Sequence, residues 1–360
     1  MSDNEFFHTL PCVENLRDAV EDRFGQKVVH LELFKFSSCS VVYKINLKGA
    51  NGKTNPIVAR STPQNPYWGT SLSKPQLESE IYSADLLRKN NIPTPKVLLD
   101  GQILNIRGIG KDAYLPFFFM EFVEGEAGDR ILLETKDPVK INRLLKKIAL
   151  IFAKIHNVKG EEFGLISSIG KTIDGNSNFQ DYFAKLIKTK HAFLQKNNIT
   201  ASFDEIELKC NSALVLAQKE GYQFNPTLGL YDLGGGNMLI DDENINVLDL
   251  STCGWYETIM DFCGFYFSLG SFMDRKLDKD ITADDLFKKY YTEFGGSLPD
   301  ERIFDSLIKV FLYNELISFA IYSANHRSKL KNDKYPNILK NALEIWSVDN
   351  KSMFKFLDAI

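Results

Sequence analysis

The amino-acid sequence predicts an α+β protein with two lobes, a β-rich front and a helical back. Short segments rich in β-branched and aromatic residues, separated by turn residues, follow one another from about residue 28 to about residue 122. From about residue 140 onward, apolar residues recur every three or four positions, which is the spacing of amphipathic helices. Polar residues suited to catalysis stand together between Leu230 and Asp249, inside the helical part.

The chain begins with a predicted helix, followed by strands. Residues 13–24 place four apolar side chains, from Val13 to Phe24, at helical spacing, and Gly25 favours a stop after them. Strands are predicted over residues 28–36, 41–47 and 56–60. Asn51-Gly52 supplies a hairpin turn between the last two of these strands.

A Pro- and Ser-rich loop is expected over residues 62–76, before a second helix over residues 77–89. Pro93 and Pro95 end this helix, and strands are predicted over residues 97–99 and 117–122. Helices are then predicted over residues 141–156, 179–196, 203–220, 286–294, 303–323 and 338–357. This order gives the β-rich front and the helical back.

The composition is that of an ordinary globular protein and excludes several other classes. Hydrophobic residues make up 44% of the 360 residues and charged residues 25%. The net charge of −4 provides no general attraction to nucleic acid or to an anionic membrane surface, so neither partner is expected. The five scattered cysteines form no C-x-x-C pair and indicate free thiols in a reducing compartment.

The chain is expected to be cytoplasmic. Its first residues, MSDNEFFHTL, lack the basic and apolar regions of a signal peptide. The longest apolar run, residues 114–123, is too short to span a bilayer and contains Pro116 and Glu121. No membrane partner is therefore expected, and the sequence does not indicate an oligomeric state.

The segment Leu230-Tyr-Asp-Leu-Gly-Gly-Gly-Asn237 carries the main functional signal. Asp232 and Asn237 have the D-L-x-x-x-N spacing of a kinase catalytic loop, and Asp249 follows an apolar strand. Phosphoryl transfer needs a carboxylate to orient the attacking hydroxyl and hard oxygen ligands for Mg²⁺. Taken singly, Asp232 also suits a turn, Asn237 an Asx-turn and Asp249 a strand end. Together they favour a phosphotransferase.

Four further motifs occur in the order found in one known family. These are Arg60 at the end of Ile57-Val-Ala-Arg60, Glu80 ahead of Pro93, the strand Phe119-Met-Glu-Phe-Val-Glu-Gly125, and Ile155-His156 before Gly164. With the segments around Asp232 and Asp249, they make the chain resemble the aminoglycoside phosphotransferase/choline kinase-type family of small-molecule kinases. The resemblance covers roughly residues 13 to 325.

The resemblance implies a two-lobed protein-kinase-like fold. Residues 1–119 would form the N-terminal β-rich nucleotide-binding lobe, and residues 120–124 would form the hinge. Residues 125–360 would form the helical C-terminal lobe, with the catalytic loop and the acceptor site. The implied activity is Mg²⁺-dependent transfer of the ATP γ-phosphate to a small-molecule hydroxyl, such as that of an amino alcohol, a sugar or an aminoglycoside.

The resemblance also implies which residues bind the nucleotide. Arg60 takes the place of the strand lysine that binds phosphates, and Glu80 pairs with it. The turn between the first two strands would cover the phosphates with Ser37, Ser38 and Ser40. In the hinge, the Met120 side chain, the Glu121 carbonyl and the Val123 amide would meet the adenine. Each assignment has an alternative: the serine segment is only a polar hairpin turn, Arg60 and Glu80 are solvated charges, and the segment that contains Met120 is only a central strand.

In the second lobe, Asp232 is the implied catalytic base, and Asn237 and Asp249 are the implied Mg²⁺ ligands. Asp261 would hydrogen-bond to the backbone of the catalytic loop, and His156 is interpreted as a packed helix residue.

The chain departs from the family at Leu230 and Tyr231, where the family usually has His and Gly. These changes favour an acceptor site unlike that of the resistance enzymes. Trp255, Tyr256 and Glu257 offer a possible site for a cation, although the aromatic residues that follow are more typical of a core. Two alternatives stay open: a catalytically silent pseudokinase acting as a scaffold, and a kinase acting on a protein.

Overall fold

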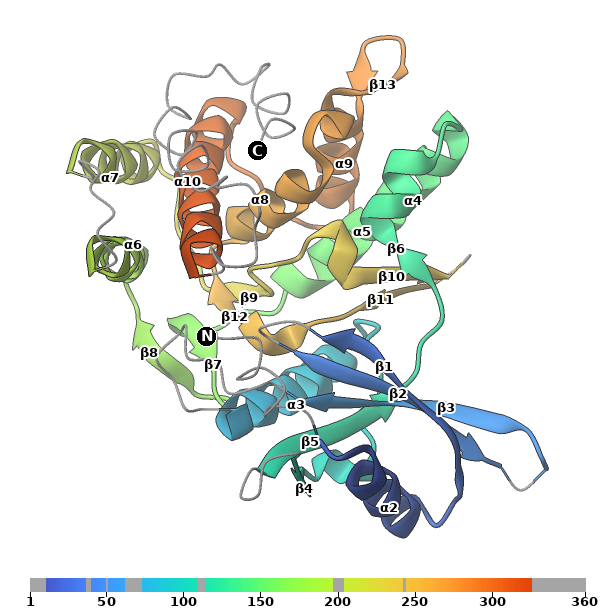
Figure 1. Ribbon diagram of the computed structural model, residues 1–360. Coiled ribbons are helices and arrows are strands. Elements are labelled where there is room, and N and C mark those ends of the chain that lie inside the picture. Colours follow the sequence, from blue (N-terminus) through green and yellow to red (C-terminus); the bar gives the residue numbers. More distant parts are fainter. Residues whose placement is uncertain are drawn as a thin grey trace. The chain divides into compact units, whose positions relative to one another are not determined.

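The computed structural model describes residues 11–36, 40–49, 51–61, 73–108, 114–196, 204–241 and 244–325. Contacts divide the chain into two compact units. The first comprises Met1–Glu124, Ile166–Lys171 and Asn246–Ser251, and the second comprises Gly125–Leu165, Thr172–Ile245 and Thr252–Ile360. The elements are mainly strands in the first unit and mainly helices in the second (Figure 1), so the predicted α+β class is confirmed.

The first unit is built on an antiparallel sheet of five strands in the order β1-β2-β3-β5-β4 (Figure 1). The strands are β1 (Val28–Phe36), β2 (Val41–Lys48), β3 (Thr54–Ser61), β4 (Leu104–Arg107) and β5 (Tyr114–Glu121). β2 pairs with β3 up to Lys48↔Thr54, so the hairpin predicted at Asn51-Gly52 is confirmed. Gly52 has a φ of 76°, a conformation that glycine adopts without steric cost.

Helix α2 (Val13–Phe24) covers one face of this sheet. Leu16 and Val20 are fully buried and belong to one hydrophobic cluster with side chains of all five strands. The helix ends where predicted, because Gly25 adopts a left-handed conformation and its N–H caps the helix. Val13 is 41% exposed, so the apolar face is one residue shorter than its spacing indicated.

Helix α3 (Ser73–Lys89) ends before Pro93, as predicted, but the strand predicted over residues 97–99 is wrong. Only Val97 bridges to β5, and the chain then turns through the 3₁₀ segment η2 (Leu99–Gly101). All three residues of η2 have positive φ. Asp100 and Gly101 favour such a turn, and this local preference outweighs the apolar character of the preceding residues.

The second unit contains seven described helices (Figure 1). They are α4 (Gly128–Glu134), α5 (Pro138–His156), α6 (Phe179–Lys196), α7 (Asp204–Lys219), α8 (Thr258–Leu269), α9 (Ala283–Glu293) and α10 (Glu301–Asn325). Five of them match predicted helices, and the helix predicted over residues 338–357 lies outside the described residues. α9 begins three residues earlier than predicted, because Thr282 and Asp285 form a capping box.

Short strands of the described residues form three further sheets. β7 (Phe163–Ile166), β8 (Thr172–Asn176), β9 (Thr227–Gly229) and β12 (Gly254–Tyr256) form a sheet in the order β8-β7-β12-β9. A further sheet has the order β11-β10-β6, with β6 (Glu126–Ala127), β10 (Met238–Asp241) and β11 (Asn244–Val247). β13 (Lys276–Asp278) and β14 (Ile281–Thr282) pair as a hairpin. The remaining 3₁₀ segments are η3 (Gly235–Asn237), η4 (Leu250–Thr252) and η5 (Gly270–Asp274).

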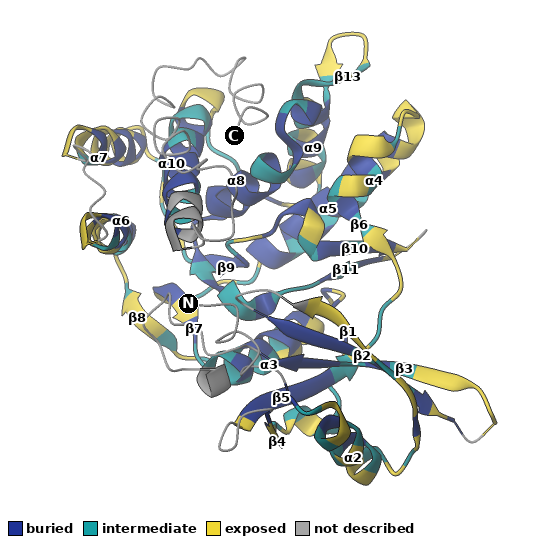
Figure 2. Ribbon diagram, in the orientation of Figure 1, coloured by how far each residue is buried: buried dark blue, intermediate teal, exposed yellow. Residues whose placement is uncertain are grey.

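The aromatic run after Glu257 forms the core of the second unit, as its helical spacing indicated. Figure 2 shows α8 buried along most of its length. The Phe152 ring of α5 lies 5.7 Å from Phe262, 5.3 Å from Phe265 and 5.2 Å from Phe287. These rings lie within the range of favourable aromatic contacts. None of the helices in the described ranges is both long and apolar enough to cross a membrane.

Candidate active site

The two predicted residues of the catalytic loop lie together in the second unit. The loop follows β9, and Asp232 is exposed while Asn237 is partly buried at the end of η3. The Asn237 Nδ2 atom donates to the Asp232 backbone oxygen at 2.8 Å and to the Asp232 carboxylate at 3.1 Å. One side chain thus fixes the path of the loop and orients the carboxylate.

A glycine in this loop is required by its close approach to α4. A Cβ atom added at Gly235 would lie 2.6 Å from the backbone nitrogen of Asp129. Real Cβ contacts are never that short, so a larger residue would push the loop away from the helix. Gly235 is therefore needed for the packing of this loop against α4.

Asp261 anchors the start of the catalytic loop, as predicted. Its carboxylate accepts hydrogen bonds from the backbone N–H of Leu230, at 3.1 Å, and of Tyr231, at 2.8 Å. Asp261 lies in the first turn of α8 and is 1% exposed. A buried carboxylate satisfied by two backbone donors is a rigid support, because breaking either bond leaves a desolvated charge.

His156 completes this support and has the structural role expected of it. It is 2% exposed, with Nε2 3.2 Å from the Asp261 carboxylate and Nδ1 3.0 Å from the Tyr291 hydroxyl. A ring that carries its proton on Nε2 donates to Asp261 and accepts from Tyr291, so both contacts are satisfied without a charged histidine.

Tyr231, which precedes the candidate base, points its hydroxyl at helices α6 and α10. Its oxygen accepts from the Lys190 ammonium at 2.8 Å and from the Asn314 side-chain amide. Its ring centroid lies 5.6 Å from that of Tyr256, in the segment that follows Asp249. The side chain therefore braces this segment. Leu230 is buried, as expected for a residue that only packs.

Sequence reasoning missed Lys190. It lies on the buried face of α6, whose other buried residues are Phe179, Phe183, Ile187, His191 and Leu194. A lysine at a core position of an amphipathic helix is itself a signal, because lysine is almost never fully buried without partners. Burial lowers the pKa of Lys190 to about 8, and the neighbouring Glu315 opposes this change.

The first unit contains a second charged cluster. Arg60 on β3 makes two hydrogen bonds to Glu80 on α3, from Nε at 2.6 Å and from Nη2 at 3.2 Å. Arg60 Nη2 also donates to the Asp249 carboxylate at 2.7 Å. Arg60 is 8% exposed and Glu80 3% exposed, so the expected ion pair is present and buried. This two-point contact uses the planar fork of the guanidinium.

The protonation of this cluster follows from its burial and its charges. Burial raises the pKa of Glu80, and the Arg60 guanidinium opposes the rise. Burial also acts to raise the pKa of Asp249, but Arg60 and a hydrogen bond from Ser251 outweigh it and lower the pKa. Asp249 is thus held as a carboxylate, the form that binds a metal ion. Its side chain remains 25% exposed.

Asp249 is positioned by the segment that follows α3. The Thr94 hydroxyl donates to the Val247 oxygen at 2.8 Å, and the Val247 N–H donates to the Pro93 oxygen at 2.9 Å. These bonds fix the end of β11 beside the helix that carries Glu80. Asp249 itself has a φ of 54°, which is uncommon for a residue other than glycine.

The remaining residues predicted for the nucleotide belong to two segments of the first unit. Ser37 and Ser38 lie outside the described residues, and Ser40 is buried just before β2. Met120 is partly buried opposite Val58 of β3, and Glu121 ends β5. Residues 122–125 belong to no helix or strand, so Val123 lies in an irregular segment.

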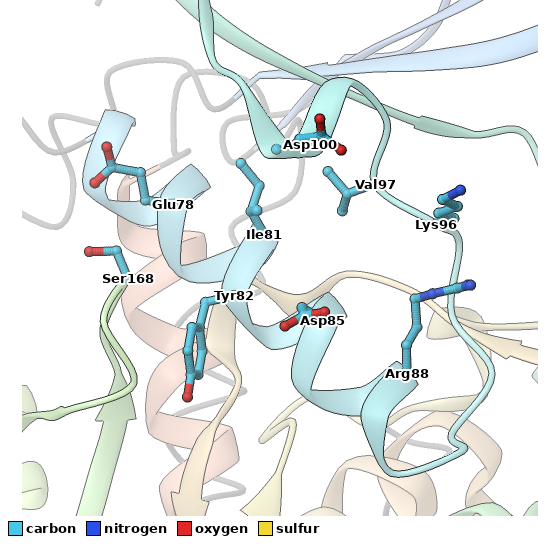
Figure 3. A pocket seen from close by; sticks show the side chains of 10 residues that line it. Glu78, Ile81, Tyr82, Asp85, Arg88, Lys96, Val97, Asp100 and Ser168 are labelled. Atoms are coloured by element: carbon cyan, nitrogen blue, oxygen red, sulfur yellow. The ribbon is translucent and has the colours of Figure 1, made fainter.

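The first unit has a cavity of about 650 Å³ on the outer face of α3 (Figure 3). In the figure, Glu78 and Ser168 lie at one side of it, and Arg88 and Lys96 lie at the other. The residues predicted for the nucleotide and described by the structure do not line it. Glu80 points instead at Arg60, so the cavity is separate from the Arg60–Glu80–Asp249 cluster.

The possible cation site at Trp255, Tyr256 and Glu257 is not supported by the structure. Glu257 is 2% exposed, caps α8 by accepting from the Ile259 N–H at 2.7 Å, and accepts from the Tyr222 hydroxyl. Tyr256 is 3% exposed. Burial raises the pKa of Glu257 to about 7, which further weakens its attraction for a cation. The two residues are part of the core.

Comparison with known proteins finds a matching family. A family model described as "Phosphotransferase enzyme family" matches residues 54–294 of the chain. These residues make up more than half of the chain and include β3, α3, both candidate clusters and α8. No curated protein matches the chain by sequence.

Solved structures share the fold at low sequence identity. An aminoglycoside phosphotransferase in a ternary complex with ADP and hygromycin B has a TM-score of 0.62 and 13% identity, over 92% of this chain and 97% of that one. A proposed fructosamine-3-kinase from Thermobifida fusca has a TM-score of 0.60 and 17% identity, over 92% and 100%. An ethanolamine kinase from Plasmodium vivax has a TM-score of 0.55 and 15% identity, over 89% and 82%. The predicted protein-kinase-like fold is confirmed.

Proposed function

Because the chain belongs to the phosphotransferase enzyme family, we propose that it transfers the γ-phosphoryl group of ATP, with Mg²⁺, to a hydroxyl group of a small molecule. The observation that carries the proposal is the loop from Asp232 to Asn237, in which the amide of one residue holds the carboxylate of the other. An exposed carboxylate on a rigid loop is suited to orienting a hydroxyl for attack.

The proposal assigns a role to each residue by its place in the motifs. Asp232 orients the acceptor hydroxyl and takes its proton, while Asn237 and Asp249 supply oxygen ligands to Mg²⁺. Within the described ranges, no group of three or more His, Cys, Asp or Glu side chains is arranged to hold a metal ion. Two protein ligands are enough for Mg²⁺, because waters and phosphate oxygens usually supply its remaining ligands.

Nucleotide binding is assigned to the first unit. Arg60 would contact the phosphates while Glu80 holds its guanidinium in place. Met120, the Glu121 carbonyl and the Val123 amide would meet the adenine, and Ser37, Ser38 and Ser40 would cover the phosphates. ADP is bound in the aminoglycoside phosphotransferase structure that shares this fold, which supports an adenine nucleotide as the donor here. The lobes at residues 1–119 and 125–360, the hinge at 120–124 and the cytoplasmic location stay predictions.

We further propose that the acceptor is not an aminoglycoside. The side chain of Tyr231 stands where the family usually has a glycine, and its hydroxyl is bound by Lys190 and Asn314. A side chain fixed beside the candidate base gives the acceptor side a shape different from that of the resistance enzymes.

The test is acceptor-dependent ADP release with Mg·ATP against a panel of amino alcohols, sugars and aminoglycosides. The proposal expects turnover with one class of hydroxyl compound and weak turnover with kanamycin-type compounds. Efficient kanamycin phosphorylation, with kcat/KM above about 10⁴ M⁻¹s⁻¹, would restore the antibiotic as substrate. Binding of Mg·ATP without transfer to any acceptor or protein would instead indicate the pseudokinase, and transfer only to a protein would indicate the protein kinase.

A further inference from the structure

Lys190 is a buried lysine whose bonding capacity is fully used within the second unit. It is 7% exposed and lies on α6, facing α10. Its ammonium donates to the Tyr231 hydroxyl at 2.8 Å, to the Asn314 side-chain oxygen at 2.6 Å and to the Ser318 hydroxyl at 2.6 Å. An ammonium has three N–H donors, and these contacts, together with a fourth to the Asn314 backbone oxygen at 3.3 Å, use all of them.

The same contacts fix the side chain of Tyr231. Its hydroxyl accepts from Lys190 and from the Asn314 amide, which belong to two different helices. The Lys190 ammonium also lies 5.4 Å from the Tyr231 ring centroid, within the range of a cation–π contact. Tyr256 packs against the ring from a third element. The tyrosine is therefore held at its tip and along its ring.

The backbone of Tyr231 needs such a hold. Its φ is 59°, in the left-handed region that residues other than glycine rarely adopt. The Asp232 N–H donates to the Leu230 oxygen at 2.6 Å, which closes a tight turn centred on Tyr231. Three-residue turns with positive φ at the centre are rare and strained. Strained residues persist where the surrounding structure over-determines them.

Two sets of bonds hold this turn. Asp261 binds the N–H groups of Leu230 and Tyr231 from the backbone side, as described above. The Lys190–Asn314 cluster binds the same turn through the Tyr231 side chain. The next residue is Asp232, so any relaxation of the turn moves the candidate base.

We propose that Lys190 is a positioning residue for Asp232. By anchoring the Tyr231 hydroxyl together with Asn314, it keeps the residue before the base in its left-handed conformation and so aims the carboxylate at the acceptor. This role rests on the proposed function, because aiming Asp232 matters only if Asp232 orients the acceptor hydroxyl. It also explains how a tyrosine can stand where a glycine would need no anchor.

The test compares Lys190→Met with Lys188→Met. Both lysines lie on α6, but Lys188 is exposed, so the control carries the same substitution outside the cluster. In Lys190→Met, kcat should fall by about 10- to 100-fold, because a small misplacement of a catalytic group costs that much. The KM for ATP should change by less than about twofold. Lys188→Met should match the wild type in both.

Two further measurements separate positioning from general loss of structure. If Lys190 acts through Tyr231, then Lys190→Met should lower kcat far less in a Tyr231→Phe background than alone, since the hydroxyl that it anchors is gone. Amide hydrogen exchange of residues 230–238, followed by mass spectrometry, should accelerate in Lys190→Met and not in Lys188→Met. Equal exchange in the two variants, or additive effects of the two substitutions on kcat, would overturn the proposal.

Failure of this proposal and failure of the proposed function give different results. If the wild type phosphorylates an acceptor and Lys190→Met keeps its kcat, the positioning role is wrong and the function stands. If the wild type phosphorylates no acceptor, the proposed function fails, and the assignment of Lys190 to a catalytic carboxylate fails with it.

Discussion

Asp232 and Asp249 have different surroundings, so their variants should fail in different ways. Asp232 is exposed and its carboxylate accepts from Asn237 of the same loop, whereas Asp249 is bound to the buried Arg60. Asp232→Asn should keep Mg·ATP affinity and lose about 10²- to 10⁴-fold in kcat, because the base acts on the acceptor. Asp249→Ala should lose both the metal and the nucleotide.

Thermal-shift titration of the two variants measures this difference. Mg·ATP at a hundredfold excess over its Kd should stabilise the wild type and Asp232→Asn by about 2.7 kcal/mol. It should not stabilise Asp249→Ala. Wild-type turnover by Asp232→Asn on a confirmed acceptor would show that the base has been assigned wrongly.

Tyr231→Gly tests the acceptor side at a single residue. Glycine tolerates the positive φ of this position, so the turn keeps its backbone, but Lys190 and Asn314 lose the hydroxyl that they bind. The kcat or KM for the acceptor should therefore change more than the Kd for ATP. Steady-state kinetics with each substrate varied in turn provides the comparison. A change confined to the affinity for ATP would show that Tyr231 does not act on the acceptor side.

Among single residues, the sequence predicted those that belong to a recognisable motif. It missed those whose role depends on contacts between distant segments of the chain. Asp261 was predicted because the segment around it resembles a motif of the family, and its bonds to the loop are present. Lys190 bonds to Asn314, which lies 124 residues further along the chain. No local pattern specifies that pairing, because it depends on how α6 and α10 pack.

Among the elements, α3 carries the buried partner of Arg60 and, at its surface, the ion pair between Asp85 and Lys89. Glu80→Ala should destabilise the protein by about 3 kcal/mol, the lower part of the range for breaking a buried pair, because Arg60 keeps Asp249 as a partner. The KM for ATP should rise as the guanidinium loses its support. Urea unfolding and ATP kinetics measure the two effects.

Asp85→Ala is the matched control on the same helix. Asp85 pairs with Lys89 at the surface, where solvent screens the attraction, so its loss should leave unfolding and ATP kinetics essentially unchanged. Equal effects of the two substitutions would remove the reason for assigning Glu80 to the nucleotide site.

Element types were predicted well where an apolar period ran over several turns, and poorly where the element was short. α6 matches its predicted bounds, because its apolar face is continuous from Phe179 to Leu194. α4 has seven residues and β4 has four, too few for a period to stand out. The strand predicted over 97–99 failed because the turn favoured by Asp100 and Gly101 includes Leu99, whose own residue type gives no signal for its positive φ.

For the whole molecule, the Lys190 cluster should make stability depend on pH. Burial lowers the pKa of Lys190 from 10.5 to about 8, so the unfolded chain holds more protons between these values and stability rises with pH there. Burial raises the pKa of Glu315 from 4.5 to about 7, with Asp232 adding to the rise, so stability falls as pH rises from 4.5 to 7. The cluster should therefore support the fold least between about pH 7 and 8.

The measurement is urea unfolding from pH 5 to pH 10 for the wild type and for a Lys190→Met, Glu315→Gln double variant. The difference between the two free energies of unfolding removes the contribution of titrating groups that do not interact with the cluster. His191, which is bonded to Glu207 and Tyr313, does interact with it: burial lowers the pKa of His191 and Lys190 adds to this lowering, so His191 contributes to the difference. A difference that does not vary with pH would contradict the assigned pKa changes.

The central claim is that this protein moves a phosphoryl group from ATP to a small-molecule hydroxyl with Asp232 as the base. The most direct measurement follows the γ-phosphate of labelled ATP into the acceptor, with Mg²⁺, for the wild type and Asp232→Asn side by side. Label should appear in the acceptor with the wild type and be lost with Asp232→Asn, although both proteins bind Mg·ATP. Absence of labelled acceptor with the wild type across amino alcohols, sugars and aminoglycosides, or equal transfer by both proteins, would contradict the account.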